Sequence, residues 1–261
     1  MQLYFLDSDG LSVPVRYYLH PQHKTQVALI GMLHVGEKNF YLQIDKILQD
    51  CEVVIYEEPF IRDSATMEQL DKAWRDKLEE KGNLNESFLA AIFLPMPPQK
   101  FMNDQSLVQE THHFDYTQKH WISGDGTWDG NAKENAALSE DVWTQIRDAI
   151  KTLPTTIKRE KVKAAKKFLK NVDAGKASMQ EYISFRNLHE EEIEEKIHKR
   201  TLVDPRDKLT FEIFDNIIET RAPLSIGIKY GNGHLPGMDA ELQARDYRYI
   251  ATMWLRILTI K

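Results

Sequence analysis

The sequence predicts an α/β fold, with a central mixed β-sheet built from two similar βαβ-type halves and a large helical insert between them. Short apolar runs bounded by turn residues lie near both ends of the chain, whereas the middle is charged and has apolar residues at helical spacing. In addition, an apolar run at each end leads into the pattern Gly-x-x-His, at Gly31/His34 and at Gly231/His234. The two ends therefore form matching halves of one sheet.

Composition sets further bounds. The chain has 261 residues, of which 42% are hydrophobic, enough for a sizeable core. Its formal net charge of -6 argues against nucleic-acid or membrane-surface partners, which require a basic face. One cysteine, Cys51, allows no intramolecular disulfide. With neither a signal peptide nor an apolar membrane span, a cytoplasmic location is the expectation.

We expect a single domain over 1–261, with its sheet core in 1–60 and 222–261 and a mainly helical insert or lid in 61–221.

The N-terminal half begins with strands. "QLYFL" and "LSVPVRYYL" flank the turn "DSDG" and predict a hairpin that leads into a third strand, "TQVALIG". After His34, the apolar stripe Phe40, Ile44, Ile47 and Leu48 predicts a helix. The run "EVVIYEEP" then predicts another strand, so 25–59 forms a βαβ unit with a parallel pairing.

The middle and the C-terminal part follow the same logic. Apolar spacing and end signals predict helices within the segments 64–82, 84–98, 139–154, 156–171 and 187–200. The last two are highly charged, and we favour a solvated surface over a packed pair. The C-terminal half then predicts a strand and turn in "LSIGIKYGNGH", a short helix in "DAELQARD" and a closing strand in "YRYIATMWLRILTI".

Candidate functional residues follow three of these strands. In open α/β sheets, ligands bind beyond the carboxyl ends of the strands, where both Gly-x-x-His turns fall, as does Glu57 or Glu58. Two imidazoles and a carboxylate are a ligand set that leaves metal positions open for water and substrate. Glycines in such turns, Gly31, Gly231 and Gly233, let the backbone bend and approach a ligand closely.

Each of these histidine and glycine patterns also has an explanation that involves no metal or catalytic site. A lone histidine after a strand is usually a satisfied surface or core residue, and only the duplicated context raises the significance of His34 and His234. A glycine-rich turn can also cradle phosphate, but "GNGHLPG" lacks the lysine of a P-loop. The pair His112 and His113 is more typical of a loop than of a metal site.

The segments "ALIGMLHVGEKNFYLQIDKIL", "CEVVIYEEP" and "IKYGNGHLPGM" resemble the paired Gly-x-x-His motifs of the TraB/PrgY (GumN)–Tiki superfamily, which is related more distantly to erythromycin esterase and ChaN-like proteins. The resemblance covers both ends of the chain. It implies roles for the following residues: His34 and His234 as metal or catalytic residues, Glu57 or alternatively Glu58 as the strand-end glutamate, Arg186 and Asn187 in a helix of the insert, and Asp125 before it. In the first turn, where this superfamily usually has a small residue and a threonine, this chain has Met32 and Leu33.

The resemblance implies a metal-dependent hydrolase that cleaves an amide or ester bond in a small peptide-like substrate. A divalent ion of Mn, Co or Zn type, held by His34, Glu57 and His234, would activate water, and Arg186 would bind a carboxylate or an oxyanion. Two alternatives remain open: a non-catalytic regulator that binds a small ligand or metal, and a metal-independent, erythromycin-esterase-like hydrolase with a histidine base. A homodimer is compatible with the sequence.

Overall fold

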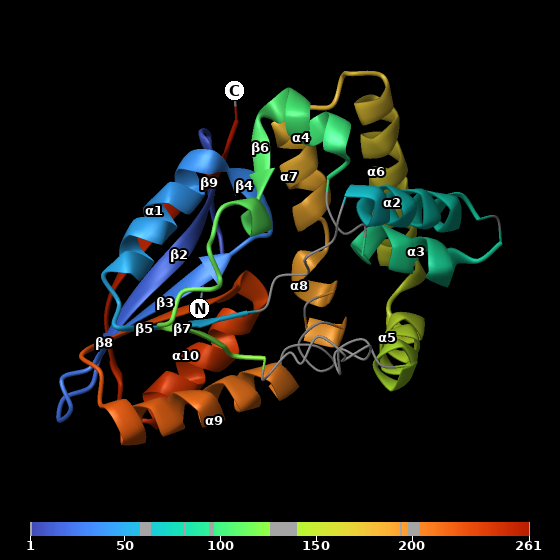
Figure 1. The fold of residues 1–261 in the computed structure, drawn as a ribbon. Coiled ribbons are helices and arrows are strands. Elements are labelled where there is room, and N and C mark those ends of the chain that lie inside the picture. Colours follow the sequence, from blue (N-terminus) through green and yellow to red (C-terminus); the bar gives the residue numbers. More distant parts are fainter. Residues whose placement is uncertain are drawn as a thin grey trace. The chain divides into compact units, whose positions relative to one another are not determined.

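A computed structural model of the chain describes residues 2–57, 64–80, 82–93, 97–125, 140–193, 195–197 and 204–260. The chain divides into two compact units. One, which we call the sheet unit, comprises 1–59, 108–133 and 202–260, and the other, the helical unit, comprises 60–107, 134–201 and residue 261. The predicted α/β class is confirmed, with a mixed central sheet that contains parallel and antiparallel pairs (Figure 1).

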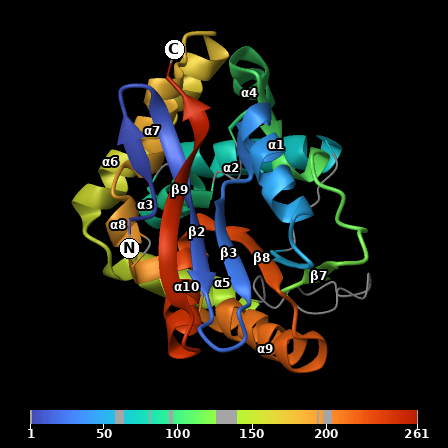
Figure 2. The same cartoon turned by 90° about the vertical axis from the view of Figure 1, so that its left-hand side faces the viewer.

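The sheet is formed by strands from three separate parts of the sequence. Its strands are β1 (Phe5–Asp7), β2 (Gly10–Leu19), β3 (Gln26–Met32), β5 (Val53–Tyr56), β7 (Trp121–Ser123), β8 (Ser225–Gly231) and β9 (Arg248–Thr259). Their order is β1-β2-β3-β8-β5-β7, and β9 also pairs with β2 (Figure 2). The long β2 is antiparallel to β1, β3 and β9, whereas β3, β8, β5 and β7 run parallel. The predicted hairpin and the closing strand are confirmed.

The predicted pairing within the N-terminal βαβ unit is wrong. Strands β3 and β5 are parallel, but β8 lies between them, so that Ile228 is paired with Leu29 on one side and with Ile55 on the other. Residues 226–230 of β8 are all buried, which suits a central strand covered on both faces. Local sequence cannot reveal this insertion, because the strand that separates the pair comes from the other end of the chain.

Helices cover both faces of this sheet. Helix α1 (Lys38–Gln49) lies on one face and buries the stripe that contains Phe40, Ile44 and Leu48. Helices α9 (Asp204–Arg221) and α10 (Leu235–Ala244) lie on the other face, as Figures 1 and 2 show. There, residues such as Phe211 and Leu242 join a buried cluster with alternate residues of β3, β5 and β8. The layers position the strand ends that carry the candidate site.

The sheet unit extends beyond the ranges 1–60 and 222–261 that the sequence predicts. Three short elements, β6 (Leu107–Gln109), the 3₁₀ turn Glu110–His112 and β7, fall in the expected helical insert, and so does α9. Strand β7 pairs with β5, and β6 pairs with β4 (Val35–Glu37). Strands of three residues are too short to show a period of two, so the sequence does not predict them.

The helical unit contains α2 (Ser64–Glu79), α3 (Leu84–Phe93), α4 (Gln99–Gln105), α5 (Glu140–Thr152), α6 (Thr155–Asp173), α7 (Met179–Asn187) and α8 (Glu190–Ile193). The first two predicted helices, α5 and α6 are confirmed. The helix predicted within 187–200 is present as α8, but it begins only at Glu190, because Asn187 still belongs to α7 and His189, with a φ of 58°, separates the two helices. Solvation of α6 is also incomplete, since Lys158 and Lys161 are buried.

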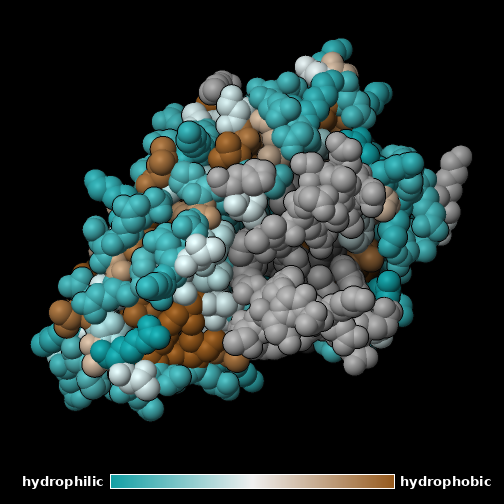
Figure 3. Space-filling model, viewed as in Figure 1, coloured by the Kyte–Doolittle hydropathy of each residue, from teal (hydrophilic) through white to brown (hydrophobic). Residues whose placement is uncertain are grey.

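Hydrophilic residues cover most of the described surface that is visible in Figure 3. No described helix has the length and apolar composition that crossing a membrane requires.

Candidate functional site

Three neighbouring strand ends bring His34, Glu57 and His234 together. His34 follows β3, Glu57 directly follows β5, and His234 ends the 3₁₀ turn Asn232–His234 after β8. Because β3, β8 and β5 are adjacent and parallel, their carboxyl ends lie along one edge of the sheet. Nε2 of His234 lies 3.7 Å from Oε1 of Glu57, and the Glu57 carboxylate interacts electrostatically with both imidazoles. The three residues therefore follow strands that end at the same edge of the sheet, and their joint role in a site stays a prediction.

Glu57 is a buried carboxylate with donors on both oxygens. The backbone N–H of Gly231 donates to Oε2 at 2.5 Å, and Nη1 of Arg206 donates to Oε1 at 2.8 Å. Burial by itself would raise the pKa of Glu57. The positive charge of Arg206, together with the two imidazoles and the Gly231 N–H, outweighs this effect and holds the pKa far below its usual range. Glu57 is therefore an anion at neutral pH.

Arg206 joins the ends of β5 and β7. Its Nε and Nη2 donate to the two carboxylate oxygens of Asp125 at 2.9 and 2.6 Å, in addition to the bond with Glu57. Such a bidentate pair fixes the orientation of the guanidinium. The resemblance pointed to Asp125, but Arg206 was not predicted. The hydroxyl of Tyr230 lies 3.4 Å from Asp125 and extends this network to β8.

His234 is oriented by a carboxylate from α9. Its Nδ1 lies 2.6 Å from Oδ1 of Asp207, and both side chains are almost fully buried. Because a carboxylate only accepts hydrogen bonds, Nδ1 carries the hydrogen. Oδ2 of Asp207 lies where a Cβ on Gly237 would come within 2.1 Å, so the glycine makes room for the carboxylate. The imidazole is thus held with Nε2 toward Glu57.

His34 has an equivalent carboxylate partner but is much more accessible. Its Nδ1 donates to Oε2 of Glu110 at 2.9 Å, and 43% of its side chain is exposed. Burial by itself would lower the pKa of His34, but the hydrogen bond and the charge of Glu110 outweigh it and raise the pKa. Glu110 itself is 2% exposed and also accepts from the hydroxyl of Tyr116 at 2.9 Å.

Behind Glu110 lies a buried lysine. Nζ of Lys229 forms an ion pair with Oε1 of Glu110 and lies 5.2 Å from the ring centres of both Phe114 and Tyr116. Burial would raise the pKa of Glu110, but the charges of Lys229 and His34 lower it well below its usual value. A continuous chain of polar contacts therefore runs from Lys229 through Glu110 to His34.

The glycines of both motifs make room for side chains. A Cβ on Gly31 would come within 2.1 Å of Oδ1 of Asn232, and a Cβ on Gly231 within 2.9 Å of Oε2 of Glu57. Gly233 lies inside the 3₁₀ turn, and the described glycines with positive φ are elsewhere, at positions 10, 82 and 175. What approaches these glycines closely is the protein's own polar side chains, and no left-handed backbone is involved.

Glu58, Arg186 and Asn187 are the other predicted site residues. Glu58 lies outside the described residues. Arg186 and Asn187 form the last turn of α7 in the helical unit, so their catalytic role stays a prediction.

The predicted metal ligands are held in place by protein groups. Glu57 accepts from Arg206 and Gly231, and Nδ1 of each imidazole is bound to a carboxylate, which is also how metal-ligating histidines are commonly oriented. Across the part of the chain that is described, no group of three or more His, Cys, Asp or Glu side chains is arranged to hold a metal. A divalent ion of Mn, Co or Zn type stays a prediction of the resemblance.

Four site residues were missed by sequence reasoning: Arg206, Asp207, Glu110 and Lys229. For three of them a signal existed. The pair Asp204-Pro205 is typical of a helix start and places the next two residues in a first turn. The single charge in "PLSIGIK" predicts a buried lysine, which requires an acidic partner. Nothing local distinguishes Glu110.

Comparison of the chain with protein-family models, with curated proteins and with solved structures finds no match. Fold and site define the class, an α/β protein with a cluster of carboxylates, imidazoles and an arginine at the carboxyl edge of its sheet. The resemblance to the TraB/PrgY–Tiki superfamily stays a prediction from the motif residues.

Proposed function

We propose that this chain is a hydrolase that cleaves an ester or amide bond in a small substrate with a water molecule activated by His34. One observation carries the proposal: two imidazoles, each with Nδ1 on a buried carboxylate, interact with the same anionic Glu57. A histidine oriented through Nδ1 by a carboxylate is the arrangement that general-base catalysis uses.

His34 is assigned as the general base. Glu110 fixes the hydrogen on Nδ1, which leaves the Nε2 lone pair to take a proton, and the exposure of the side chain makes that nitrogen accessible to water and substrate. As His34 removes the proton, the water oxygen attacks the carbonyl carbon. The bond to the alcohol or amine then breaks, and His34 returns the proton to this leaving group. General-base catalysis of this kind contributes about 10²- to 10⁴-fold in rate.

Glu57 is assigned to orienting the attacking water, and His234 to positioning the substrate oxygen on which negative charge develops. Glu57 is an acceptor at neutral pH and holds a hydrogen of the attacking water. His234 is held by Asp207 through Nδ1, and its Nε2, which lies toward Glu57, faces the substrate oxygen that gains negative charge. Arg206 is a positioning residue that keeps Glu57 ionised and in place.

The test is a hydrolysis assay with p-nitrophenyl butyrate and a peptide library. We expect His34→Gln to lower kcat/KM by about 10²- to 10⁴-fold. His120→Gln, a half-buried histidine of the same unit, is the matched control and should retain activity. Equal activity of His34→Gln and wild type would refute the assignment. If wild type cleaves none of these substrates, the non-catalytic regulator is favoured instead.

Metal analysis of the purified protein separates the two hydrolase mechanisms. Because the proposed mechanism activates water with His34, we expect activity to survive dialysis against EDTA without a stoichiometric divalent ion. Activity that is lost with EDTA and restored by zinc or manganese would support the metal-dependent alternative and overturn ours.

A further inference from the structure

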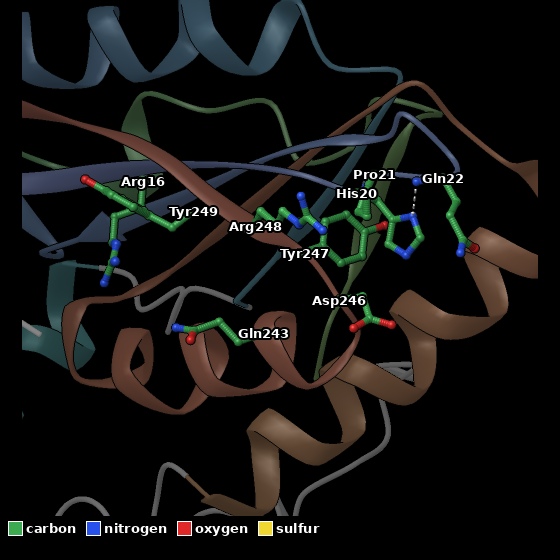
Figure 4. A pocket seen from close by; sticks show the side chains of 9 residues that line it. All are labelled: Arg16, His20, Pro21, Gln22, Gln243, Asp246, Tyr247, Arg248 and Tyr249. Atoms are coloured by element: carbon green, nitrogen blue, oxygen red, sulfur yellow. Dashed lines mark hydrogen bonds between the residues drawn. The ribbon is translucent and has the colours of Figure 1, made fainter.

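We propose that the sheet unit has a second ligand site, for a nucleotide-sized anion that carries a planar ring. The site is a cavity of about 760 Å³ between α10 and the paired strands β2 and β9 (Figure 4). Its lining includes Arg16, His20, Gln243, Tyr247 and Tyr249. This volume lies in the range of about 300–1,000 Å³ that is usual for small-molecule sites.

The cavity is distinct from the candidate hydrolase site. His20 follows the end of β2 and lies next to the amino end of β3, whereas His34 follows the carboxyl end of β3. The seven residues of β3 separate these two ends by about 20 Å at 3.3 Å per residue. A ligand in this cavity therefore does not contact the residues assigned to hydrolysis.

Two arginines, Arg16 and Arg248, and one acid, Asp246, line the cavity, and a second carboxylate, Asp239, offsets the charge of Arg16. Arg16 is anchored by Asp239, 3.4 Å from its Nη1, and lies 4.6 Å from the ring centre of Tyr249. Its Nε is buried without a hydrogen-bond acceptor among the described residues. A buried donor without an acceptor is costly.

Arg248 supplies the second charge. It is exposed, begins β9 and forms no ion pair with a carboxylate in the described ranges. Guanidinium groups bind phosphate and carboxylate oxygens with charge-assisted hydrogen bonds, so an anionic ligand suits Arg248.

Aromatic faces between the arginines point to a ring in the ligand. Figure 4 shows Tyr249 beside Arg16, with Arg248 and Tyr247 farther along the cavity. Residue Tyr249 is 47% exposed, and Tyr247 packs edge-on against His20 at 5.1 Å. Nδ1 of His20 accepts from two backbone N–H groups, so its hydrogen is on Nε2. A planar ring stacks on Tyr249 while its phosphate or carboxylate reaches an arginine.

The test is isothermal titration with adenosine 5′-monophosphate, phenyl phosphate, benzoate, adenosine and inorganic phosphate as probes. We expect adenosine 5′-monophosphate to bind most tightly, with adenosine and inorganic phosphate at least about tenfold weaker because each lacks one part of the ligand. Phenyl phosphate and benzoate show which anionic group is preferred. Absence of binding by all three ring-bearing anions at millimolar concentration would overturn the proposal.

Variants locate the site. Arg248→Gln and Tyr249→Ala should each weaken binding by about tenfold, the loss of one charge-assisted bond or one stacking contact. Arg221→Gln, an exposed arginine at the end of α9, is the matched control and should leave the affinity unchanged. His34→Gln should also leave it unchanged, so failure of the hydrolase proposal does not decide this one. Equal affinity of Arg248→Gln, Tyr249→Ala and wild type would place binding elsewhere and refute the site.

Discussion

At the residue scale, the least expected feature is a lysine in the middle of the sheet. Lys229 is 1% exposed, and its ion pair with Glu110 lies directly behind the proposed base His34. Burial of both charges costs free energy that the pair recovers only while both partners are present. The pair thus links the stability of the sheet unit to the orientation of His34.

We expect Lys229→Met to lower the free energy of unfolding by about 3–5 kcal/mol, because Glu110 would remain as a buried charge without its main partner. Urea denaturation followed by tryptophan fluorescence measures this loss. Lys208→Met, an exposed lysine on α9, serves as the control and should change stability by less than about 0.5 kcal/mol. A loss of similar size in both variants would argue against the buried pair.

The raised pKa of His34 predicts the acid side of the pH profile. Only neutral His34 accepts a proton, so kcat/KM should fall as the pH drops through the pKa of His34, which lies above the ordinary value near 6.5. A rate profile for p-nitrophenyl butyrate between pH 5 and 9, combined with an NMR titration of the His34 ring, measures both midpoints. Midpoints at or below about 6.5 would contradict the role of Glu110.

At the element scale, the placement of β8 between β3 and β5 creates the site. It brings the turn after β8 against the end of β3, where Gly31 leaves space for the buried side chain of Asn232. Nδ2 of Asn232 donates to the carbonyl of Leu3, which fixes the amide in that space. The glycine therefore matters for packing between two chain ends.

We expect Gly31→Ala to destabilise the protein by about 1–3 kcal/mol, since the new Cβ would overlap Oδ1 of Asn232. Adding Asn232→Ala removes the overlapping atom. The double variant should therefore lose less than the sum of the two single variants, and a double-mutant cycle from urea denaturation measures the difference. Strict additivity would show that the two residues do not interact.

At the scale of the whole molecule, the sheet unit and the helical unit have separate cores. In the helical unit, Nζ of buried Lys161 donates to three carbonyls at the end of α7, those of Phe185, Arg186 and Leu188, at 2.9–3.0 Å. These bonds hold the end of α7 in the way that Lys229 holds Glu110 in the other unit.

We expect Lys161→Met to increase hydrogen exchange in the helical unit and Lys229→Met to increase it in the sheet unit, because each substitution removes contacts within one core. Exchange followed by mass spectrometry of peptides from both units distinguishes them. Lys163→Met, an exposed lysine on α6, is the control. If each buried variant raised exchange equally in both units, the chain would unfold as the single domain that the sequence predicts.

Much of the fold and part of the site could be predicted from the sequence. The helices with clear stripes, the N-terminal hairpin and the three strands that precede His34, Glu57 and His234 were all predicted because periodicity and turn residues are local signals. Strands β6 and β7 are too short to carry such a signal. Glu110, Asp207 and Arg206 could not be assigned to the site, because a charged residue in a loop or a first helical turn is usually solvated.

By itself, the sequence determined which residues form strands and helices and that two glycine–histidine turns end two of the strands, because these properties depend on neighbours along the chain. Tertiary structure alone decided that β8 separates β3 and β5 and that each histidine has its own buried carboxylate. Those contacts join residues 27 to 174 positions apart, and only the packing of distant apolar faces selects among them.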